Sequence, residues 1–307
     1  MNRLAGIIVA AIGLLVAILS IVKIVPGLTG AGVAMIFLGG LIIGLSFVDK
    51  PDSEGAEKMS TPGTLANMFV APTDVFRNLR RHPRWLVAVL IMSVLSSIYV
   101  NLFVTRLTPE RVVGFTTEKT LEMPMMNDEA RKQVQAGSDE QIAAFRNPVQ
   151  IAGSAVTAFT SSVFGFAFLA LIFFLFVMAM GGKINYWQAF SAAVYAALPF
   201  SIIRFVLNTI ILFIKDPDDI HPILGQGSLI QDNLSFLVTP AANPVIYSFL
   251  ASITLLGFYW LWLNATGLKN AGEKVTGTIA WSASIAIYVV LILFSVALAA
   301  IFPGFIS

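Results

Sequence analysis

The fold is decided by residues 151–214, which read IAGSAVTAFTSSVFGFAFLALIFFLFVMAMGGKINYWQAFSAAVYAALPFSIIRFVLNTIILFI. Two long apolar segments are joined here by the short polar link Gly181-Gly182-Lys183-Ile184-Asn185. Each segment exceeds the roughly 20 apolar residues that cross a bilayer as a helix. Because the link is so short, the two segments are predicted to form an antiparallel transmembrane hairpin, around which the remaining helices pack.

The composition places the whole chain in the membrane class. Hydrophobic residues make up 57% of its 307 residues and charged residues only 12%, whereas soluble domains carry about 25% charged residues. The net charge of +2 gives no indication of nucleic-acid binding. The absence of cysteine excludes disulfides, thiolate metal sites and cysteine nucleophiles. The two histidines, His82 and His221, are too far apart to suggest a metal site, so no metal or other cofactor is expected.

Seven apolar segments predict an all-α polytopic membrane bundle of about seven transmembrane helices. Residues 1–48 are expected to form an N-terminal hairpin, 49–64 a cytoplasmic linker and 65–307 a five-helix membrane domain. In the hairpin, the spacing of Gly40 and Gly44 is typical of close helix packing; a contact between two copies is the alternative. The predicted spans cover 4–24, 28–48, 85–107, 151–180, 186–214, 243–263 and 278–302.

A polar piece at residues 106–150 interrupts the five-helix domain. Asn127 can cap a short helix that ends at Gly137. The run Ser138-Asp139-Glu140-Gln141 is a capping box, which is typical of a further helix start. We therefore predict a small extracytoplasmic insert made of short helices.

A basic amphipathic stretch precedes the third predicted span. Apolar residues alternate with arginines between Leu65 and Arg81, and Pro72-Thr73-Asp74 is a typical helix start. The pattern favours a helix at the membrane interface that binds anionic lipid or a partner protein, and a simple topology signal is the alternative. The candidate lipid- or partner-binding residues are Phe76, Arg77, Arg80, Arg81 and Arg84.

The same arginines predict the orientation of the chain. They cluster directly beside a membrane entry point, whereas the cations of residues 106–150 are accompanied by acids. Because cations next to a span favour the cytoplasmic side, the N-terminus is expected inside and the C-terminus outside.

Arg204 lies deep inside the predicted span 186–214. An arginine in a span costs at least a few kcal/mol and usually faces the bundle interior or water. The sequence offers as partners Asn208 one turn on, Tyr195, and carbonyls freed by Pro199. Tyr195, Pro199, Arg204 and Asn208 are therefore the candidate intramembrane polar residues. They indicate either an anion or lipid-headgroup site, or a structural arginine satisfied by carbonyls.

Several stretches together resemble one family of membrane proteins. Residues 66–92 begin ANMFVAPTDVFRNLRRHPRW and resemble the opening of bacterial Yip-domain proteins. In that family a P-x-x-V/A-F helix, a basic turn and a proline lead into the first of five spans. The resemblance covers about residues 65–303 and continues through Gly181-Gly182-Lys183, Trp187-Gln188-Ala189-Phe190, Tyr195-Ala196-Ala197-Leu198-Pro199 and Leu261-Trp262-Leu263-Asn264-Ala265-Thr266-Gly267-Leu268-Lys269.

The resemblance implies a five-helix bundle with its N-terminal end in the cytoplasm, here of a bacterial cytoplasmic membrane. Eukaryotic relatives are linked to vesicle traffic and to Rab-type small GTPases. This chain has a two-span hairpin in place of their long cytoplasmic N-terminal region, which argues against GTPase binding and indicates a prokaryotic member.

No enzymatic constellation is present in the sequence: it contains no glycine-rich phosphate loop, histidine–acid zinc pair or nucleophile with a recognisable base. We therefore expect a non-enzymatic membrane scaffold that associates with itself, with partner proteins or with lipid. The alternative is a small-solute or lipid transporter that uses the bundle centre around Arg204.

Overall fold

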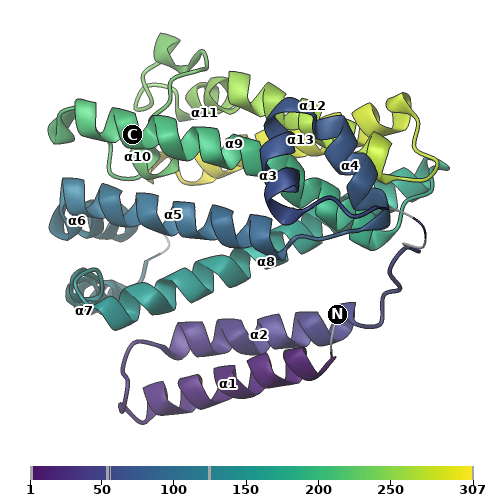
Figure 1. The fold of residues 1–307 in the computed structure, drawn as a ribbon. Coiled ribbons are helices and arrows are strands. Elements are labelled where there is room, and N and C mark those ends of the chain that lie inside the picture. Colours follow the sequence, from purple (N-terminus) through teal and green to yellow (C-terminus); the bar gives the residue numbers. More distant parts are fainter. Residues whose placement is uncertain (1–2, 53–54, 56, 124–125, 306–307) are drawn as a thin grey trace. The chain divides into compact units, whose positions relative to one another are not determined.

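The computed structural model describes residues 3–52, 55, 57–123 and 126–305 (Figure 1). All regular elements of these residues are helices, which confirms the predicted all-α class. They form two compact units, and helices α5, α9, α12 and α13 contribute a stretch to each. The first unit holds Met1–Val94, Val149–Ser201 and Trp260–Ile285, and the second holds Leu95–Pro148, Ile202–Tyr259 and Ala286–Ser307.

The long apolar helices confirm a multi-pass membrane protein. Within the described residues, five helices are long and apolar enough to cross a bilayer. They are α1 (Arg3–Ile21), α5 (Leu86–Leu107), α8 (Pro148–Ala179), α9 (Tyr186–Ile214) and α13 (Gly277–Ile301).

Two further apolar stretches differ from the simple spans that the sequence predicts. The stretch 243–263 is broken into α11 (Pro244–Ser252) and α12 (Leu255–Ala271), which are bent by 50° and would count as a sixth span if taken together. Helix α2 (Thr29–Leu45) has 17 residues, fewer than the roughly 20 that cross a bilayer untilted. The total of seven spans therefore stays a prediction.

Helices α1 and α2 lie side by side as an antiparallel hairpin, in the purple shades of Figure 1. Glycines hold them together, because a Cβ added to Gly32 would lie 2.5 Å from the backbone nitrogen of Ala17, and one added to Gly39 would lie 2.6 Å from that of Ala10. Gly6 and Gly13 make the reciprocal contacts from α1. The predicted role of Gly40 and Gly44 in this contact is wrong, because both are exposed and a Cβ on either would meet no atom within 4 Å.

The basic amphipathic stretch forms two helices in the first unit. Helix α3 (Thr61–Val70) begins inside the range predicted as linker, because the hydroxyl of Ser60 accepts a hydrogen bond from the backbone N–H of Gly63. Helix α4 (Pro72–Arg81) follows after Ala71. Its apolar face packs into the bundle, where the Phe76 ring lies so close to Gly267 of α12 that an added Cβ would approach it to 3.0 Å.

In the second unit the polar insert contains α6 (Pro109–Leu121) and α7 (Asp128–Ala144). Asn127 caps α7 as predicted, since its side chain accepts from the backbone N–H of Ala130. The predicted second helix start at Ser138 is wrong. The Ser138 hydroxyl donates to the carbonyl of Gln135 within an unbroken helix, so it is not a cap.

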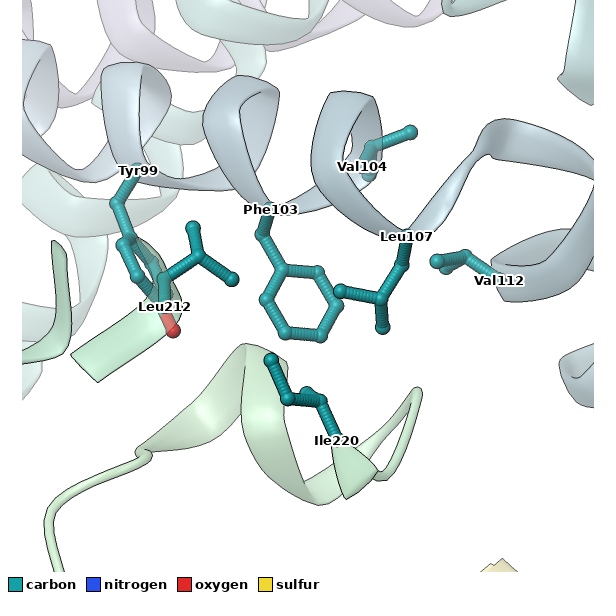
Figure 2. Packing of buried hydrophobic residues seen from close by; sticks show 7 residues of the cluster. All are labelled: Tyr99, Phe103, Val104, Leu107, Val112, Leu212 and Ile220. Carbon is teal, nitrogen blue, oxygen red and sulfur yellow. The ribbon is translucent and has the colours of Figure 1, made fainter. Parts of the chain in front are cut away.

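The core of the second unit joins α5 to the segment that follows α9. Figure 2 shows Phe103 and Leu107 pointing from α5 toward Ile220. Residues 215–243 between α9 and α11 contain only short turns of helix: η1 (Pro217–Asp219), α10 (Leu224–Gly227) and η2 (Ser235–Leu237). Near the end of the chain lies η3 (Pro303–Phe305). The buried hydrophobic cluster consists of Tyr99, Phe103, Val104, Leu107, Val112, Leu212 and Ile220.

We expect Gly32→Val to open the α1–α2 hairpin, because the added side chain would collide with the backbone of α1. Overpacking of this kind costs about 1–3 kcal/mol. Crosslinking by a short bis-maleimide between Arg3→Cys and Ser46→Cys, whose native side chains are hydrogen-bonded at 3.3 Å, reports the closed hairpin. The matched control is Gly40→Val, which should crosslink like the parent, and equal crosslinking of both variants would contradict the glycine contact.

Candidate functional site

The apolar face of α4 is not available to lipid or to a partner. Val75, Phe76 and Leu79 are all fully buried in the first unit. The prediction that Phe76 contacts lipid or a partner is therefore wrong: its hydrophobic face anchors the helix to the bundle. The alternation of apolar and basic residues is visible in the sequence, but its periodicity cannot tell whether protein or lipid covers the apolar side.

The arginines of α4 that are predicted to bind lipid or a partner differ in exposure and in their contacts. Arg77 and Arg81 are exposed, and Arg77 makes a 3.5 Å ion pair with Asp74. Arg80 is half-buried and donates to the carbonyl of Glu273 at 3.5 Å. Its own carbonyl accepts from Nε2 of Gln188 at 2.9 Å, so this end of α4 is fastened to both α9 and the turn after α12.

Arg84 has a structural role that differs from the predicted surface role. Its guanidinium donates to the carbonyl of Met59 at 2.5 Å and to Oδ1 of Asn78 at 3.1 Å. A longer contact of 3.5 Å reaches Oγ1 of Thr61. The half-buried Arg84 therefore holds the start of α3 against α4 instead of facing headgroups.

Two turns complete the polar end of the first unit beside α4. Lys183 and Lys274 pair through their backbones, with N–H to O=C distances of 3.0 and 3.1 Å. The Lys183 ammonium also binds Glu273 at 2.7 Å. This hydrogen bond, with the nearby positive charges of Arg80 and Lys274, holds the pKa of the Glu273 carboxyl below its ordinary value.

We call this surface the cationic end, and define it as Arg77, Arg80, Arg81, Lys183 and Lys274. Glu273 offsets part of its charge, while the side chains of Arg81 and Lys274 stay exposed. The Lys183–Lys274 bridge brings together residues about 90 positions apart in the sequence. Lys183 lies within a motif that resembles the family, but nothing in the sequence pairs it with Lys274.

The second unit contains the predicted intramembrane polar residues Arg204 and Asn208. Arg204 donates to the carbonyl of Gly227. Oδ1 of Asn208 accepts from the backbone N–H of Leu229 at 2.9 Å. The charge of Asp232 also stabilises the Arg204 guanidinium. Arg204 and Asn208 thus both bind the segment that follows their own helix, and the predicted pairing between the two residues stays a prediction.

The other two predicted polar residues lie in the first unit. Tyr195 is buried there, and Pro199 is inside α9, which continues without interruption to Ile214. The residue that sequence analysis missed is Tyr99, whose hydroxyl donates to the carbonyl of Gly225 at 2.8 Å. The glycines of Gly225-Gln226-Gly227 were the available signal, because small residues allow a loop backbone to approach a helix closely.

Asp232 also organises the break between α11 and α12. Its backbone carbonyl accepts from the N–H of Leu255 at 3.2 Å, and its carboxylate accepts from the N–H of Leu256 at 2.9 Å. A carboxylate at a helix N-terminus is favourable because it meets unpaired N–H groups and the positive end of the helix dipole. On the other side of the break, Tyr288 donates to the carbonyl of Ser252 at 3.0 Å.

The acidic segment after α9 uses its polar groups within the protein. The carboxylate of Asp216 accepts from the backbone N–H of Asp218 at 3.0 Å. Nδ1 of His221 accepts from the N–H groups of Ile223 and Leu224, both at 3.1 Å. Among the residues that the structure describes, no group of three or more His, Asp or Glu side chains could hold a metal ion.

Comparison with known proteins decides the family. The model of the Yip1 domain matches residues 66–300, which is most of the chain. The chain belongs to the Yip1 family. No curated protein and no solved structure matches it significantly. In this Yip1-family chain the matched region begins within α3 and ends in the last turn of α13, while α1 and α2 precede it.

We expect Arg84→Ala to destabilise this Yip1 domain by about 1–3 kcal/mol, because carbonyl and amide acceptors lose a charged donor. Arg81→Ala is the matched control, since exposed substitutions usually change stability by less than about 0.5 kcal/mol. SDS titration of the full chain in mixed micelles measures both. Equal stability of the two variants would mean that Arg84 is a surface cation after all.

Proposed function

We propose that this Yip1-family chain is a non-enzymatic membrane scaffold whose cationic end binds anionic groups. The observation that supports the proposal is the rigid attachment of exposed arginines to the bundle. Helix α4 is anchored by its fully buried apolar face and by the hydrogen bonds of Arg80 and Gln188. Arg81 therefore projects from a fixed support, and Lys274 is exposed on the turn that Arg80 contacts.

Fixed cations suit a docking surface for a physical reason. Binding is weakened by the cost of ordering side chains and loops at the interface, and a preformed support lowers that cost. A cation near an anionic membrane surface contributes about 1 kcal/mol of attraction. The occupants that we propose are anionic lipid headgroups and acidic segments of a membrane or cytoplasmic protein, including a second copy of the chain.

The proposal places the cationic end in the cytoplasm of a bacterial cell, with the C-terminus outside. The clustered arginines beside α5 support this orientation by the positive-inside rule. The polar insert that holds α6 and α7 would then lie on the extracytoplasmic side. Binding of a small GTPase is not part of the proposal.

A photoreactive residue in place of the exposed Arg77 tests the docking surface in cells that express the chain. Buried Phe76 would be an unsuitable position for such a probe. We expect acidic proteins or anionic lipids to be captured. Their yield should fall about 30-fold with Arg81→Glu and Lys274→Glu, since two lost attractions of about 1 kcal/mol each correspond to that factor.

The matched control variant reverses the charges of Arg131 and Lys132, two exposed cations of α7 in the second unit. This variant should capture as much as the parent. An equal loss in both variants, or no loss in either, would contradict a docking role for the cationic end. Capture of extracytoplasmic proteins alone would contradict the proposed orientation.

A second candidate function is transport of a small solute or lipid, favoured by the broken pair α11–α12 near Arg204. Discontinuous helices with free backbone groups at the break form the binding sites of many transporters. Here, however, Asp232 already occupies the N-terminus of α12, and the Arg204 guanidinium already binds the Gly227 carbonyl. These contacts favour a structural role for Arg204 over a transport role.

We expect Arg204→Leu to lower the free energy of unfolding by about 1–3 kcal/mol, because the Gly227 carbonyl loses a charged donor. Arg204→Lys, which keeps a donor, should retain more of the stability. SDS titration gives the stability, and quenching of a fluorescent lipid analogue in proteoliposomes gives lipid transfer. Unchanged stability with complete loss of transfer in Arg204→Leu would favour the transporter instead.

A further inference from the structure

The segment of residues 216–232, which we call the return loop, is fastened to the second unit by side chains from three helices. Tyr99 of α5 holds the carbonyl of Gly225, while Arg204 and Asn208 of α9 hold Gly227 and Leu229. Arg204 lies ten residues before the end of α9 at Ile214, which corresponds to about 15 Å of helix. The loop therefore folds back along α9 after leaving it.

Helix α6 fastens the beginning of the return loop. The guanidinium of Arg111 donates to the carbonyl of Pro217 at 2.6 Å. Its other terminal nitrogen donates to the carbonyls of Asp218 at 3.2 Å and Ile220 at 3.1 Å. Arg111 thereby places a permanent positive charge beside the next residue of the loop, His221.

His221 is a titratable group in the middle of these attachments. Its Nδ1 accepts from two successive backbone N–H groups, those of Ile223 and Leu224, each at 3.1 Å. An imidazole nitrogen that accepts carries no proton, so the ring is neutral and its proton is on Nε2. Nε2 is buried and meets no hydrogen-bond partner among the described residues. The ring packs edge-on against Phe115 of α6, with centroids 5.0 Å apart.

We propose that His221 is a proton-binding site whose occupation releases this part of the return loop from α6. A proton taken up from solvent on Nδ1 removes the acceptor for both N–H groups and turns it into a donor that faces them. The imidazolium that forms has positive neighbours on α6. The N–H groups of Ile223 and Leu224 would lose their acceptor within the loop, and the imidazolium would be repelled by Arg111 and Lys119 of α6. The arrangement in which this part of the loop has moved away from α6 therefore becomes favoured.

The charged groups around His221 strengthen this effect. Burial, together with the positive charges of Lys119 and Arg111, holds the pKa of His221 below its ordinary value. Glu122 pairs with Lys119 and Asp218 pairs with Arg111, both at 3.4 Å, so these acids offset part of that positive charge. Among the loop's own acids, Asp216 accepts from the loop backbone.

The sign of the pH dependence follows from this neutral state. The closed loop binds the proton more weakly than the open loop does. The stability of the closed loop is therefore complete above the ordinary histidine pKa of about 6.5 and is lost as the pH falls from there toward the lower pKa of the closed state. A single proton changes the ratio of open to closed loops by at most about tenfold per pH unit.

Two spin labels in the full chain, reconstituted in lipid nanodiscs, measure the opening directly. The chain has no cysteine, so Gln226→Cys on the loop and Gly114→Cys on α6 provide unique attachment points. Both positions are exposed, and a Cβ at Gly114 would meet no atom within 4 Å. Pulsed electron–electron distances are recorded at pH 8 and pH 5.

The wild-type pair should show one distance population at pH 8 and gain a second, longer population at pH 5. His221→Asn is the matched variant, because its Oδ1 can accept like Nδ1 but does not titrate. It should keep the closed population at both pH values. His221→Ala, which has no acceptor, should show the longer population at both.

Two outcomes would overturn the proposal. One is a wild-type distance distribution that does not change between pH 8 and pH 5. The other is a His221→Asn variant that changes as much as the wild type, because other titrating groups would then cause the opening. Thermal unfolding of each variant at pH 8 confirms that it is folded before the distances are compared.

Discussion

A backbone without regular secondary structure needs partners for its N–H and C=O groups, and in a chain this poor in polar residues few side chains can supply them. The return loop between α9 and α11 shows how the Yip1-family chain meets this constraint. Tyr99, Arg111, Arg204 and Asn208 each bind loop backbone groups. Four polar side chains of the second unit thus fix one irregular segment.

The same constraint explains why a charged residue is tolerated in α9. Arg204 would be costly if it faced lipid or an apolar core. Its guanidinium binds a carbonyl of the loop, and Asp232 supplies a nearby negative charge that also caps α12. One arginine therefore connects α9 to the segment before the broken pair α11–α12. This connection can change in response to pH only if a titratable group alters the position of the loop, and His221 is placed to do so.

The first unit combines two kinds of attachment. Close glycine contacts join α1 to α2, because in lipid the packing of backbones replaces the hydrophobic effect as a driving force. The elbow of α3 and α4 is joined to the bundle by apolar burial and by the hydrogen bond of Arg80, while Arg84 holds α3 against α4. What remains at the surface is a small set of fixed cations, which is the basis for proposing a scaffold with an anionic partner.

The sequence by itself determined the helical class, the five long apolar helices, the family and the position of the elbow, because helix length, hydrophobicity and motif order are local properties of the chain. It could not show what Phe76, Gly40 or Arg84 contacts, since the apolar or basic character of a residue does not reveal which surface covers it. The bend near Thr254 and the pairing of Arg204 with Gly227 were likewise decided by the tertiary structure. Both depend on which backbone groups the folded chain brings together, and the pattern of side chains does not specify the partner of a backbone group.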